Sequence, residues 1–245
     1  MNKIRVSVIV TSFNGEQFIA EQIRSIQKAI GSFDEVIISD DGSNDSTVDI
    51  IKRFVDEDSR IRFYHGPEKG LNDNIRFLLS KARGDYIFIS DQDDVWHSNK
   101  IEVILSYFES NPRCLVIHHN ANLIDGLGRQ IEGTVYSHIS FSNSLFRFFF
   151  KSHIFGCMIA FKKEFLKYDF VPKKNCFDAG IACFAMRTKR LLFVDDILSD
   201  YRRHGNNVSS FRKRKLPVVL KERMHLLIFI LFTVIPLKKS KKVYE

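Results

Sequence analysis

Cysteine is scarce in this chain, and its spacing forms no pattern. The 245 residues include four cysteines, and no two of them make a Cys-x-x-Cys pair. All four lie among apolar neighbours, which predicts buried thiols in a reducing compartment. The spacing argues against a disulfide framework and against a structural zinc site. The four positions are Cys114, Cys157, Cys176 and Cys183.

Glycine-rich phosphate loops are also missing. The first predicted strand runs into residues 11–16, which read Thr-Ser-Phe-Asn-Gly-Glu and match neither a dinucleotide fingerprint nor a P-loop. Both motifs need glycines so that the backbone can approach a phosphate closely. Their absence argues against NAD-dependent redox chemistry and against an ATPase. Five histidines show no ligand spacing of the His-Glu-x-x-His kind: His65, His97, His118, His119 and His138.

No apolar run is long enough to span a bilayer. The run at residues 226–237 has twelve residues, whereas a spanning helix needs about 20. The apolar stretch at residues 6–11 is too short and too close to the start for a secretory signal. We therefore expect a cytoplasmic protein.

Positive charge is concentrated at the C-terminal end. The net charge is +8, and residues 202–245 hold twelve Lys or Arg and two Glu, which leaves the rest of the chain close to neutral. A nucleic-acid-binding protein spreads basic residues over its folded face, so no nucleic-acid partner is expected. Basic residues on both sides of an apolar run favour docking on an anionic membrane surface through residues 212–245. The alternative is a packing or oligomer-forming helix with a solvated basic end.

Short strands and amphipathic helices alternate through the first half. This alternation predicts right-handed βαβ units and a mostly parallel sheet covered on both faces, which is an α/β fold. Predicted strands cover residues 6–10, 36–38, 61–64, 86–89 and 114–118, and predicted helices cover residues 18–30, 43–55, 71–82 and 98–109.

Polar residues follow three of these strands. They lie at residues 11–14, 40–43 and 91–94. Because ligands of parallel α/β sheets bind at the carboxyl ends of the strands, the three segments are expected on one rim. At the second segment, a carboxylate can accept hydrogen bonds from a nucleobase or from ribose hydroxyls. The alternative for that segment is a βα turn with a solvated helix cap.

The most informative segment is residues 84–96. A buried strand ends there in Asp91, Asp93 and Asp94, followed by Trp96, the single tryptophan of the chain. Such a concentration of negative charge is unfavourable unless a cation or ligand compensates for it. A hard divalent ion, Mg²⁺ or Mn²⁺, held together with substrate phosphates is the expected compensator. The alternative is a solvated acidic turn that caps the next helix through Ser98 or Asn99.

Four motifs together resemble the family 2 glycosyltransferases, whose fold is called GT-A. They are Val-Ile-Val-Thr-Ser-Phe-Asn at residues 8–14, Asp-Asp-Gly-Ser at 40–43, Gly-Asp-Tyr at 84–86, and Asp-Gln-Asp-Asp-Val-Trp at 91–96 with Lys100. The resemblance covers residues 4 to 207. The last motif is similar to that of the rhamnosyltransferase-like bacterial enzymes that build O-antigen, capsule and related glycans.

The resemblance implies roles in donor binding. Thr11 and Phe13 would line the nucleotide-base pocket, and Asp41 would bond the base. Asp93 would bind the metal that bridges the diphosphate, and Asp91 would contact the ribose or a metal-bound water. Residues 201–207 resemble the loop after the last strand, which can fold over the donor phosphates. The remaining predicted donor contacts are Asn14, Asp40, Lys69, Arg202, Arg203 and His204.

The resemblance also implies an acceptor half with a catalytic base. Asp178 matches the family's catalytic acid position at a helix start, although an N-cap role suits the same residue. Gly156 resembles the glycine of a strand that borders the acceptor site, and Trp96 and Phe177 complete the predicted acceptor contacts. We predict a donor half at residues 1–118, an acceptor half at 119–210 and a basic, apolar helical tail at 211–245.

These assignments imply an inverting, metal-dependent transfer from a nucleoside-diphosphate sugar to a hydroxyl of a glycan or lipid-linked glycan. The expected location is the inner face of the plasma membrane, with Mn²⁺ or Mg²⁺ as cofactor. Two alternatives remain. A sugar nucleotidyltransferase would need a Gly-rich, basic loop after the first strand, which residues 11–16 do not provide. A non-catalytic, membrane-associated module that only binds nucleotide sugars would not need Asp93 or Asp178.

Overall fold

The computed structural model describes residues 4–137, 144–150, 154–168, 177–205 and 216–232. In these ranges one sheet of nine strands forms the centre, in the order β3-β2-β1-β4-β8-β6-β9-β5, with β7 paired to β6. Neighbouring strands from β3 to β4 are parallel, and so are β6 and β9. The predicted α/β fold with a mostly parallel sheet flanked by helices is confirmed.

The first half alternates as the sequence predicts. Every residue of β1 and β2 is buried, as expected for central parallel strands that are covered on both faces. The elements are β1 (Val6–Ser12), α1 (Ile19–Ala29), β2 (Asp34–Asp40), α2 (Thr47–Glu57), β3 (Ile61–His65), α3 (Leu71–Lys81) and β4 (Tyr86–Ser90).

The second half is more irregular. Its strands β6 and β8 continue the sheet beyond β4, so both predicted halves share one sheet. The strand β8 runs antiparallel to both of its neighbours. The elements are β5 (Val95–Trp96), α4 (Lys100–Ser110), β6 (Val116–Asp125), β7 (Gln130–Thr134), α5 (Leu145–Phe150), β8 (Ile159–Lys162), α6 (Phe177–Arg187), β9 (Leu191–Arg203) and α7 (Leu216–Phe232), with 3-10 turns at Gly156–Met158 and Lys163–Lys167.

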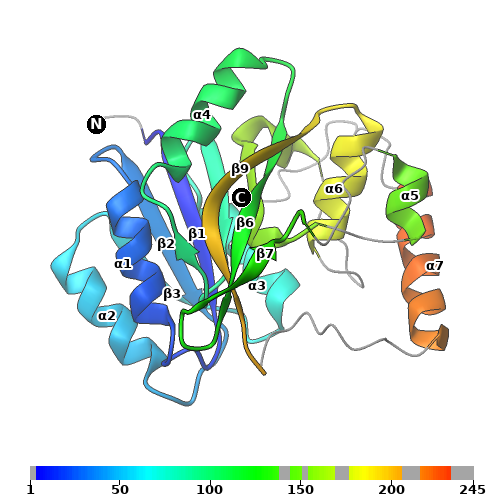
Figure 1. Cartoon of the computed structure of the whole chain (residues 1–245). Coiled ribbons are helices and arrows are strands. Elements are labelled where there is room, and N and C mark those ends of the chain that lie inside the picture. Colours follow the sequence, from blue (N-terminus) through cyan, green and yellow to red (C-terminus); the bar gives the residue numbers. More distant parts are fainter. Residues whose placement is uncertain (1–3, 138–143, 151–153, 169–176, 206–215, 233–245) are drawn as a thin grey trace.

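Two apolar layers cover the sheet. Alternate residues of β1 serve opposite layers: Val8 packs with α1, α2 and α4, while Ile9 packs with α3 and α6. The layer of α1 is built from Ile19, Ile23 and Ile26, which recur at helical spacing and are fully buried. Figure 1 shows α1 and α2 in front of the sheet and α5 and α7 at the far edge, beyond α6.

Carboxylates at the end where the strands begin have arginine partners. Arg5 forms a two-pronged pair with Asp34, with N···O distances of 3.2 and 3.0 Å. Arg60 similarly holds Asp58. The buried Glu35 receives Arg62 and Arg83 at one oxygen and the Ser7 hydroxyl at the other. These pairs fasten the starts of β1, β2 and β3 to one another.

Two sequence predictions need correction. Gly156 was expected in a strand, but it begins a 3-10 turn, and the strand starts only at Ile159. Tyr201, Arg202 and Arg203 were expected in a loop, but they end β9, because Arg202 pairs with Ile124 in β6.

Part of the predicted tail is helical. α7 packs against α5 and α6. Apolar side chains at five positions along it are well exposed, from 38% for Leu227 to 60% for Leu220, with Val218, Met224 and Ile228 between these values. Among the described residues no helix is both long and apolar enough to cross a membrane. The basic segments on either side of α7 lie outside the described residues.

Candidate functional site

Three loops meet at the edge where β1, β2 and β4 end. The amide side chain of Gln92 pairs twice with the backbone of Phe13: Phe13 N–H donates to Oε1 at 2.9 Å, and Nε2 donates to the Phe13 carbonyl at 3.0 Å. Asn14 then links the first loop to the second, since its N–H donates to Ser43 Oγ and its Oδ1 accepts from Asn44 N–H. The predicted common rim therefore exists as one bonded unit.

Gly15 makes the pairing between these loops possible. A Cβ built at this glycine would overlap the amide group of Gln92. Neither Gln92 nor Gly15 was singled out from the sequence, because Gln92 is the variable position within the Asp-x-Asp motif. The signal that could have found it is a long amide side chain placed between two acids at a strand end.

In the loop after β2, one carboxylate oxygen has no hydrogen-bond partner. The Oδ2 atom of Asp41 accepts from Gly70 N–H at 2.7 Å, whereas its Oδ1 atom is buried with no hydrogen-bond partner. Phe13 is 55% exposed beside it and Thr11 is 8% exposed. Lys69, next to Gly70, is exposed. An aromatic face and an unsatisfied acceptor suit a hydrogen-bonding ring such as a nucleobase.

Asp40, predicted as a donor contact, is occupied by its own loop. Its carboxylate accepts from the N–H groups of Gly42 and Ser43 and from the hydroxyls of Ser12 and Ser43. The side chain is buried, so this prediction is corrected: Asp40 shapes the loop that presents Asp41. Likewise, the side chain of Asn14, another predicted donor contact, accepts from Asn44 N–H and joins the first loop to the second.

The tip of β4 crowds carboxylates together. Asp91, Asp94 and the Cys157 thiol have their possible ligand atoms within 4.8 Å of one another. Burial raises the pKa of Asp91 well above its usual range, and the charges of Asp94, Asp93 and Asp178 raise it further. Burial and the charge of Asp93 raise the pKa of Asp94 to about 7. The cluster therefore holds more negative charge than the protein around it compensates.

A buried lysine lies beneath this cluster. Lys100 is 1% exposed. Its ammonium group donates to the Cys157 carbonyl at 3.2 Å and lies 4.0 Å from the centre of the Trp96 ring. Burial lowers the pKa of Lys100 to about 7. Burial, together with Asp94 and Asp91, raises the pKa of the Cys157 thiol well above its usual value, so the thiol is protonated and is not a ligand for a hard cation.

Asp93 forms a separate pair with His204. The Nε2 atom of His204 lies 2.8 Å from Asp93 Oδ2, and both side chains are about 85% buried. We predicted His204 as a diphosphate contact, but the structure places it against the predicted metal ligand. An imidazole nitrogen and two or three carboxylates suit Mn²⁺, and carboxylates alone suit Mg²⁺. The residues present therefore fit a divalent cation.

Arg202 is not positioned for a diphosphate, which corrects another prediction. It is 2% exposed, and its guanidinium binds the Asp93 carbonyl and the Glu21 carboxylate. Neighbouring Arg203 projects to the other side of the strand, where its guanidinium lies 5.8 Å from the centre of the Tyr201 ring.

Asp178 lies in the first turn of α6 and is partly exposed. Its Oδ1 accepts from the N–H of the directly following residue, Ala179, at 2.6 Å, whereas an N-cap carboxylate accepts from an N–H two or three residues on. Its charge acts on Asp91, as noted above, so the topology brings residue 178 to the acid cluster at residues 91–94.

The three predicted acceptor contacts are buried. Trp96 is 4% exposed and packs on Phe88 in the core. Phe177 is 2% exposed, and its ring lies where a side chain at Gly156 would be. Trp96 and Phe177 therefore pack in the core and expose little surface to an acceptor, so their contact with an acceptor stays a prediction.

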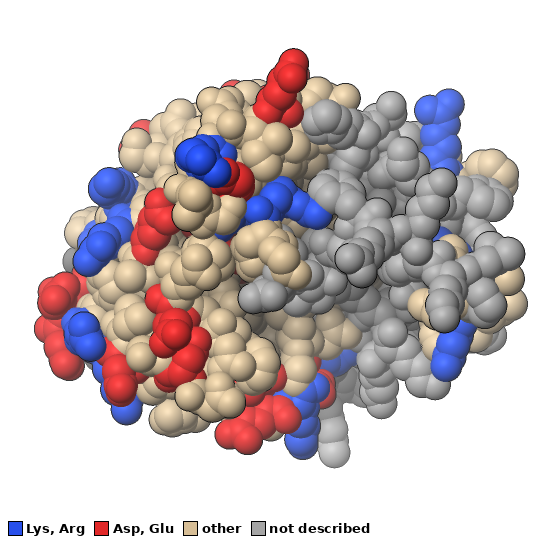
Figure 2. Space-filling view, turned by 60° about the horizontal axis from the view of Figure 1, so that its bottom comes forward, with Lys and Arg blue, Asp and Glu red and all other residues tan. Residues whose placement is uncertain are grey.

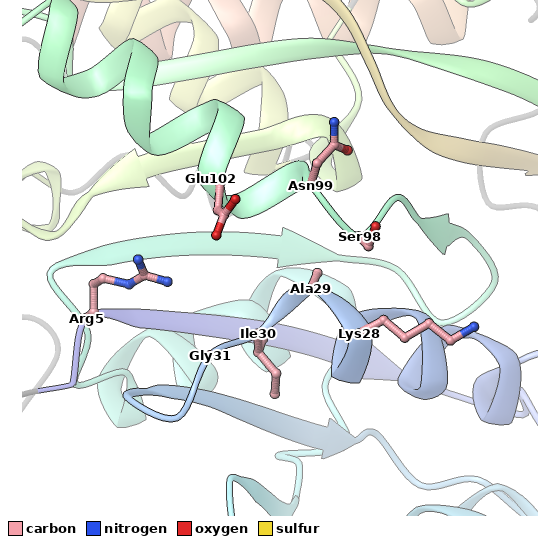
Figure 3. A pocket seen from close by; sticks show the side chains of 8 residues that line it. All are labelled: Arg5, Lys28, Ala29, Ile30, Gly31, Ser98, Asn99 and Glu102. Atoms are coloured by element: carbon pink, nitrogen blue, oxygen red, sulfur yellow. The ribbon is translucent and has the colours of Figure 1, made fainter.

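Figure 2 looks onto this edge of the sheet from below the view of Figure 1, and Asp and Glu side chains gather over its left part. A separate cavity of about 320 Å³ lies elsewhere, between the start of β1, the end of α1 and the start of α4 (Figure 3). None of its lining residues belongs to the predicted site. Their polar groups include Arg5, which is already paired with Asp34.

Solved structures of other proteins share this architecture. The structure of *Staphylococcus aureus* TarS residues 1–349 in complex with UDP-GlcNAc superposes with a TM-score of 0.72 at 16% identity, covering 94% of this chain and 67% of that one. Glucosyl-3-phosphoglycerate synthase from Mycobacterium tuberculosis, in complex with Mn²⁺, UDP and glucosyl-3-phosphoglycerate, gives a TM-score of 0.61 at 16% identity over 93% of this chain and 78% of that one. The fold is thus that of the GT-A proteins.

Residues 7–170 match Glycosyl transferase family 2, and the chain belongs to this family. Glycosyltransferase GlyG of *Streptococcus pneumoniae* is 26% identical over 83% of this chain and 72% of its own length. An uncharacterised glycosyltransferase of *Haemophilus influenzae* is 32% identical over 54% of this chain. The match spans about half of the length of that second relative, 53%. The predicted resemblance to family 2 is confirmed.

Proposed function

We propose that this protein transfers a sugar from a nucleoside diphosphate to an acceptor hydroxyl, with inversion at the anomeric carbon. The observation that carries the proposal is the convergence of residues on one edge of the sheet. There, the unpartnered Oδ1 of Asp41, the acid cluster at residues 91–94 and the carboxylate of Asp178 come together. Membership of family 2 supports the same reaction class.

The donor is expected to lie along the three bonded loops. The base would stack near Phe13 and donate to the unpartnered Oδ1 of Asp41, with Thr11 at the rim. Lys69 is close enough in the chain to Gly70, the Asp41 partner, to reach a phosphate or a sugar hydroxyl. TarS and glucosyl-3-phosphoglycerate synthase are described with UDP-GlcNAc and UDP, so UDP is the first nucleotide to test.

Asp93, His204 and Asp91 would hold the divalent cation. When bound, it acts as a Lewis acid that neutralises charge on the leaving diphosphate. The protein's part is to keep these ligands together. Arg203 stays a proposed contact of the diphosphate, while Arg202 is withdrawn from that role.

Asp178 is the proposed general base. The acceptor hydroxyl oxygen attacks the anomeric carbon, its proton passes to the Asp178 carboxylate, and the bond to the diphosphate breaks with its electron pair leaving on the phosphate oxygen. A positioned base of this kind contributes about 10²–10⁴-fold in rate. One displacement inverts the centre, so the reaction needs no enzymic nucleophile, unlike that of a retaining glycosidase.

Release of free nucleoside diphosphate tests the proposal. Purified protein is incubated with Mn²⁺ and a panel of nucleotide sugars, with and without candidate acceptors, and UDP, GDP or dTDP is measured. Acceptor-dependent release supports glycosyl transfer. Formation of nucleotide sugar from sugar phosphate and nucleoside triphosphate would instead indicate a nucleotidyltransferase. Binding of donors without turnover of any would indicate a binding module, and either result would overturn the proposal.

A lipid-linked glycan of bacterial surface polysaccharide synthesis is the proposed acceptor. The support is a relative in *Campylobacter jejuni*, 30% identical over 41% of this chain and 33% of its own length, which is named GalNAc(5)-diNAcBac-PP-undecaprenol beta-1,3-glucosyltransferase. The Asp-Gln-Asp-Asp-Val-Trp motif favours a rhamnosyl or related donor within this class. Transfer to a synthetic polyprenyl-diphosphate glycan, against the same glycan without lipid, tests the acceptor.

We also propose that α7 docks this protein on the inner face of the membrane. Leu220, Met224, Leu227 and Ile228 recur at helical spacing and share one exposed face. Phe146 of the neighbouring helix α5 is 74% exposed, and exposed Lys221 and Arg147 provide positive charge nearby. In Figure 2 the described charged side chains at the right edge are blue. An apolar helix face with basic neighbours fits an anionic membrane surface.

Co-sedimentation with vesicles tests this docking. Full-length protein should pellet with vesicles containing phosphatidylglycerol, less at high salt and least with neutral vesicles, because screening weakens only the charge contribution. Met224→Glu should reduce binding more than Glu57→Gln, which alters an exposed residue of α2. If the full chain stays in the supernatant with anionic vesicles, α7 is a packing or oligomer-forming helix instead.

A further inference from the structure

Arg202 is the largest side chain that is fully buried in the described residues. Nothing in the proposed reaction uses it, yet it lies directly beneath the predicted metal ligand. A buried guanidinium is unfavourable unless its donors and its charge are satisfied. Its partners therefore indicate what it does.

The Arg202 fork holds the backbone of the acidic loop. Its Nε donates to the Asp93 carbonyl at 2.8 Å, and its own main-chain N–H donates to Asp94 Oδ1 at 3.1 Å. A longer contact of 3.4 Å joins Nη1 to the Asp125 carbonyl. The loop at residues 93–94 is thus fixed to the end of β9 through both its main chain and a side chain.

The charge of Arg202 is balanced by Glu21, a residue that lies outside the four family motifs. Its Nη2 donates to Glu21 Oε2 at 2.6 Å, and Glu21 belongs to the first turn of α1. The Glu21 side chain is 56% exposed, in contrast to 2% for Arg202. Glu21 therefore connects the solvent-facing surface of α1 to the buried support of the acidic loop.

Phe18 completes the arrangement. The Arg202 guanidinium lies 5.0 Å from the centre of the Phe18 ring, and the His204 ring centre lies 4.7 Å from it. Arg202 lies near the end of β9 and His204 follows just after the strand, so both side chains contact the same ring. His204 in turn meets the Asp93 carboxylate.

We infer that Glu21 and Arg202 are positioning residues for the divalent cation. Arg202 fixes the peptide of Asp93, Glu21 orients the Arg202 fork, and Phe18 keeps His204 facing the Asp93 carboxylate. This inference rests on the proposed metal-dependent function. It assigns a role in that function to Glu21, which no sequence motif marks. Loss of such outer partners typically lowers metal affinity by about 10–100-fold.

The test measures Mn²⁺ affinity rather than turnover. Mn²⁺ is titrated into full-length protein with saturating UDP, and free Mn²⁺ is followed by electron paramagnetic resonance. Arg202→Lys keeps the charge but loses the two-pronged fork, so we expect affinity to fall by about 10-fold or more. Glu21→Gln keeps the shape and loses the charge, and a smaller loss is expected. Glu57→Gln removes an equivalent charge from α2 and should leave Mn²⁺ affinity unchanged.

Thermal unfolding of the metal-free variants separates positioning from folding. If Arg202→Lys does not fold, Glu21→Gln at the surface still decides the matter. Wild-type Mn²⁺ affinity in a folded Glu21→Gln variant would overturn the inference and leave the proposed function intact. Absence of Mn²⁺ and Mg²⁺ binding by the wild-type protein would remove the metal centre and this inference with it. In that case, diphosphate release in EDTA would show whether glycosyl transfer remains.

Discussion

The two ends of the sheet treat carboxylates in opposite ways. Where the strands begin, Glu35 and Asp58 are each held by arginines. Burial alone would raise the pKa of Glu35, but hydrogen bonds from Ser7 and Arg83 and the charge of Arg62 hold it below its usual value. Where β4 ends, burial and mutual repulsion raise the pKa of Asp91 and of Asp94. The acids at the first end stabilise the fold, whereas the acids at the second end raise one another's pKa and suit a cationic ligand.

This contrast predicts that substitutions at the two ends separate activity from stability. The largest effect is expected for Asp178→Asn. The amide cannot accept the acceptor's proton, so kcat should fall by about 10²–10⁴-fold, while donor affinity and melting temperature stay near wild type. Steady-state kinetics with varied donor check this. Unchanged kcat, or loss of donor binding alone, would assign the base to another residue.

Asp93→Asn should give the next largest effect. Losing a ligand of the diphosphate-neutralising cation should reduce transfer by about 10²–10³-fold, comparable to removing one transition-state donor. Stability should change little, because the charge removed from a repulsive cluster is offset by a weaker hydrogen bond to His204. Activity and thermal melts are measured together, with excess EDTA on the wild type as the parallel treatment. Full wild-type activity in EDTA would contradict a role for the metal.

Glu35→Gln should have the opposite effect: it should lower the free energy of unfolding and leave kcat unchanged. The amide cannot accept from two guanidinium groups and a hydroxyl at once, so about 1.5–3 kcal/mol of unfolding free energy should be lost. Both arginines are partly exposed and can turn to water, which limits the loss. Urea unfolding measures this change, and kcat at a permissive temperature should match the wild type. A larger loss of kcat than of stability would break the contrast between the two ends.

The smallest effect is expected for Asp58→Asn and depends on pH. The Arg60 guanidinium holds the pKa of Asp58 far below its usual value. A depressed carboxyl pKa adds stability at neutral pH that is lost as pH falls below the unfolded value of about 4. The variant should therefore be less stable at pH 7, and its difference from the wild type should begin to narrow as pH falls below about 4. Melting temperatures between pH 2 and 7 follow this, and a difference that stays constant over that range would contradict it.

The sequence was sufficient for the fold and for the location of the site. Short apolar runs predicted β1 to β4 closely, because the central strands are buried on both faces of the sheet. A period of 3.6 predicted α1 to α3, because each of these helices buries one face. The edge with the acids followed from the rule that parallel strands end together. The irregular second half was harder: Gly156 starts a turn because the ring of Phe177 fills the space beside it, and that contact joins residues 21 positions apart.

Side-chain direction was the main limit for the site. Arg202, Asp40 and Trp96 have the chemistry expected of ligand contacts, but each turns inward to partners within the protein. Glu21 is the opposite case: by its sequence it is an ordinary surface residue of α1, yet it binds the buried Arg202. One-dimensional patterns identify chemical groups, whereas their partners depend on contacts across as many as 181 positions.

The pairing of Gln92 with Phe13 across Gly15 has a consequence for changing this protein by design. A side chain at position 15 would displace the Gln92 amide, so a substitution there releases the link between the first loop and the acidic loop. The Gln92 side chain is flexible and can turn away, so the expected cost of a larger residue at position 15 is the loss of the two hydrogen bonds between Gln92 and Phe13 rather than a clash. The effects of substitutions at positions 15 and 92 are therefore expected to be non-additive, because both remove the same link, and libraries that aim to alter donor choice should vary the two positions jointly.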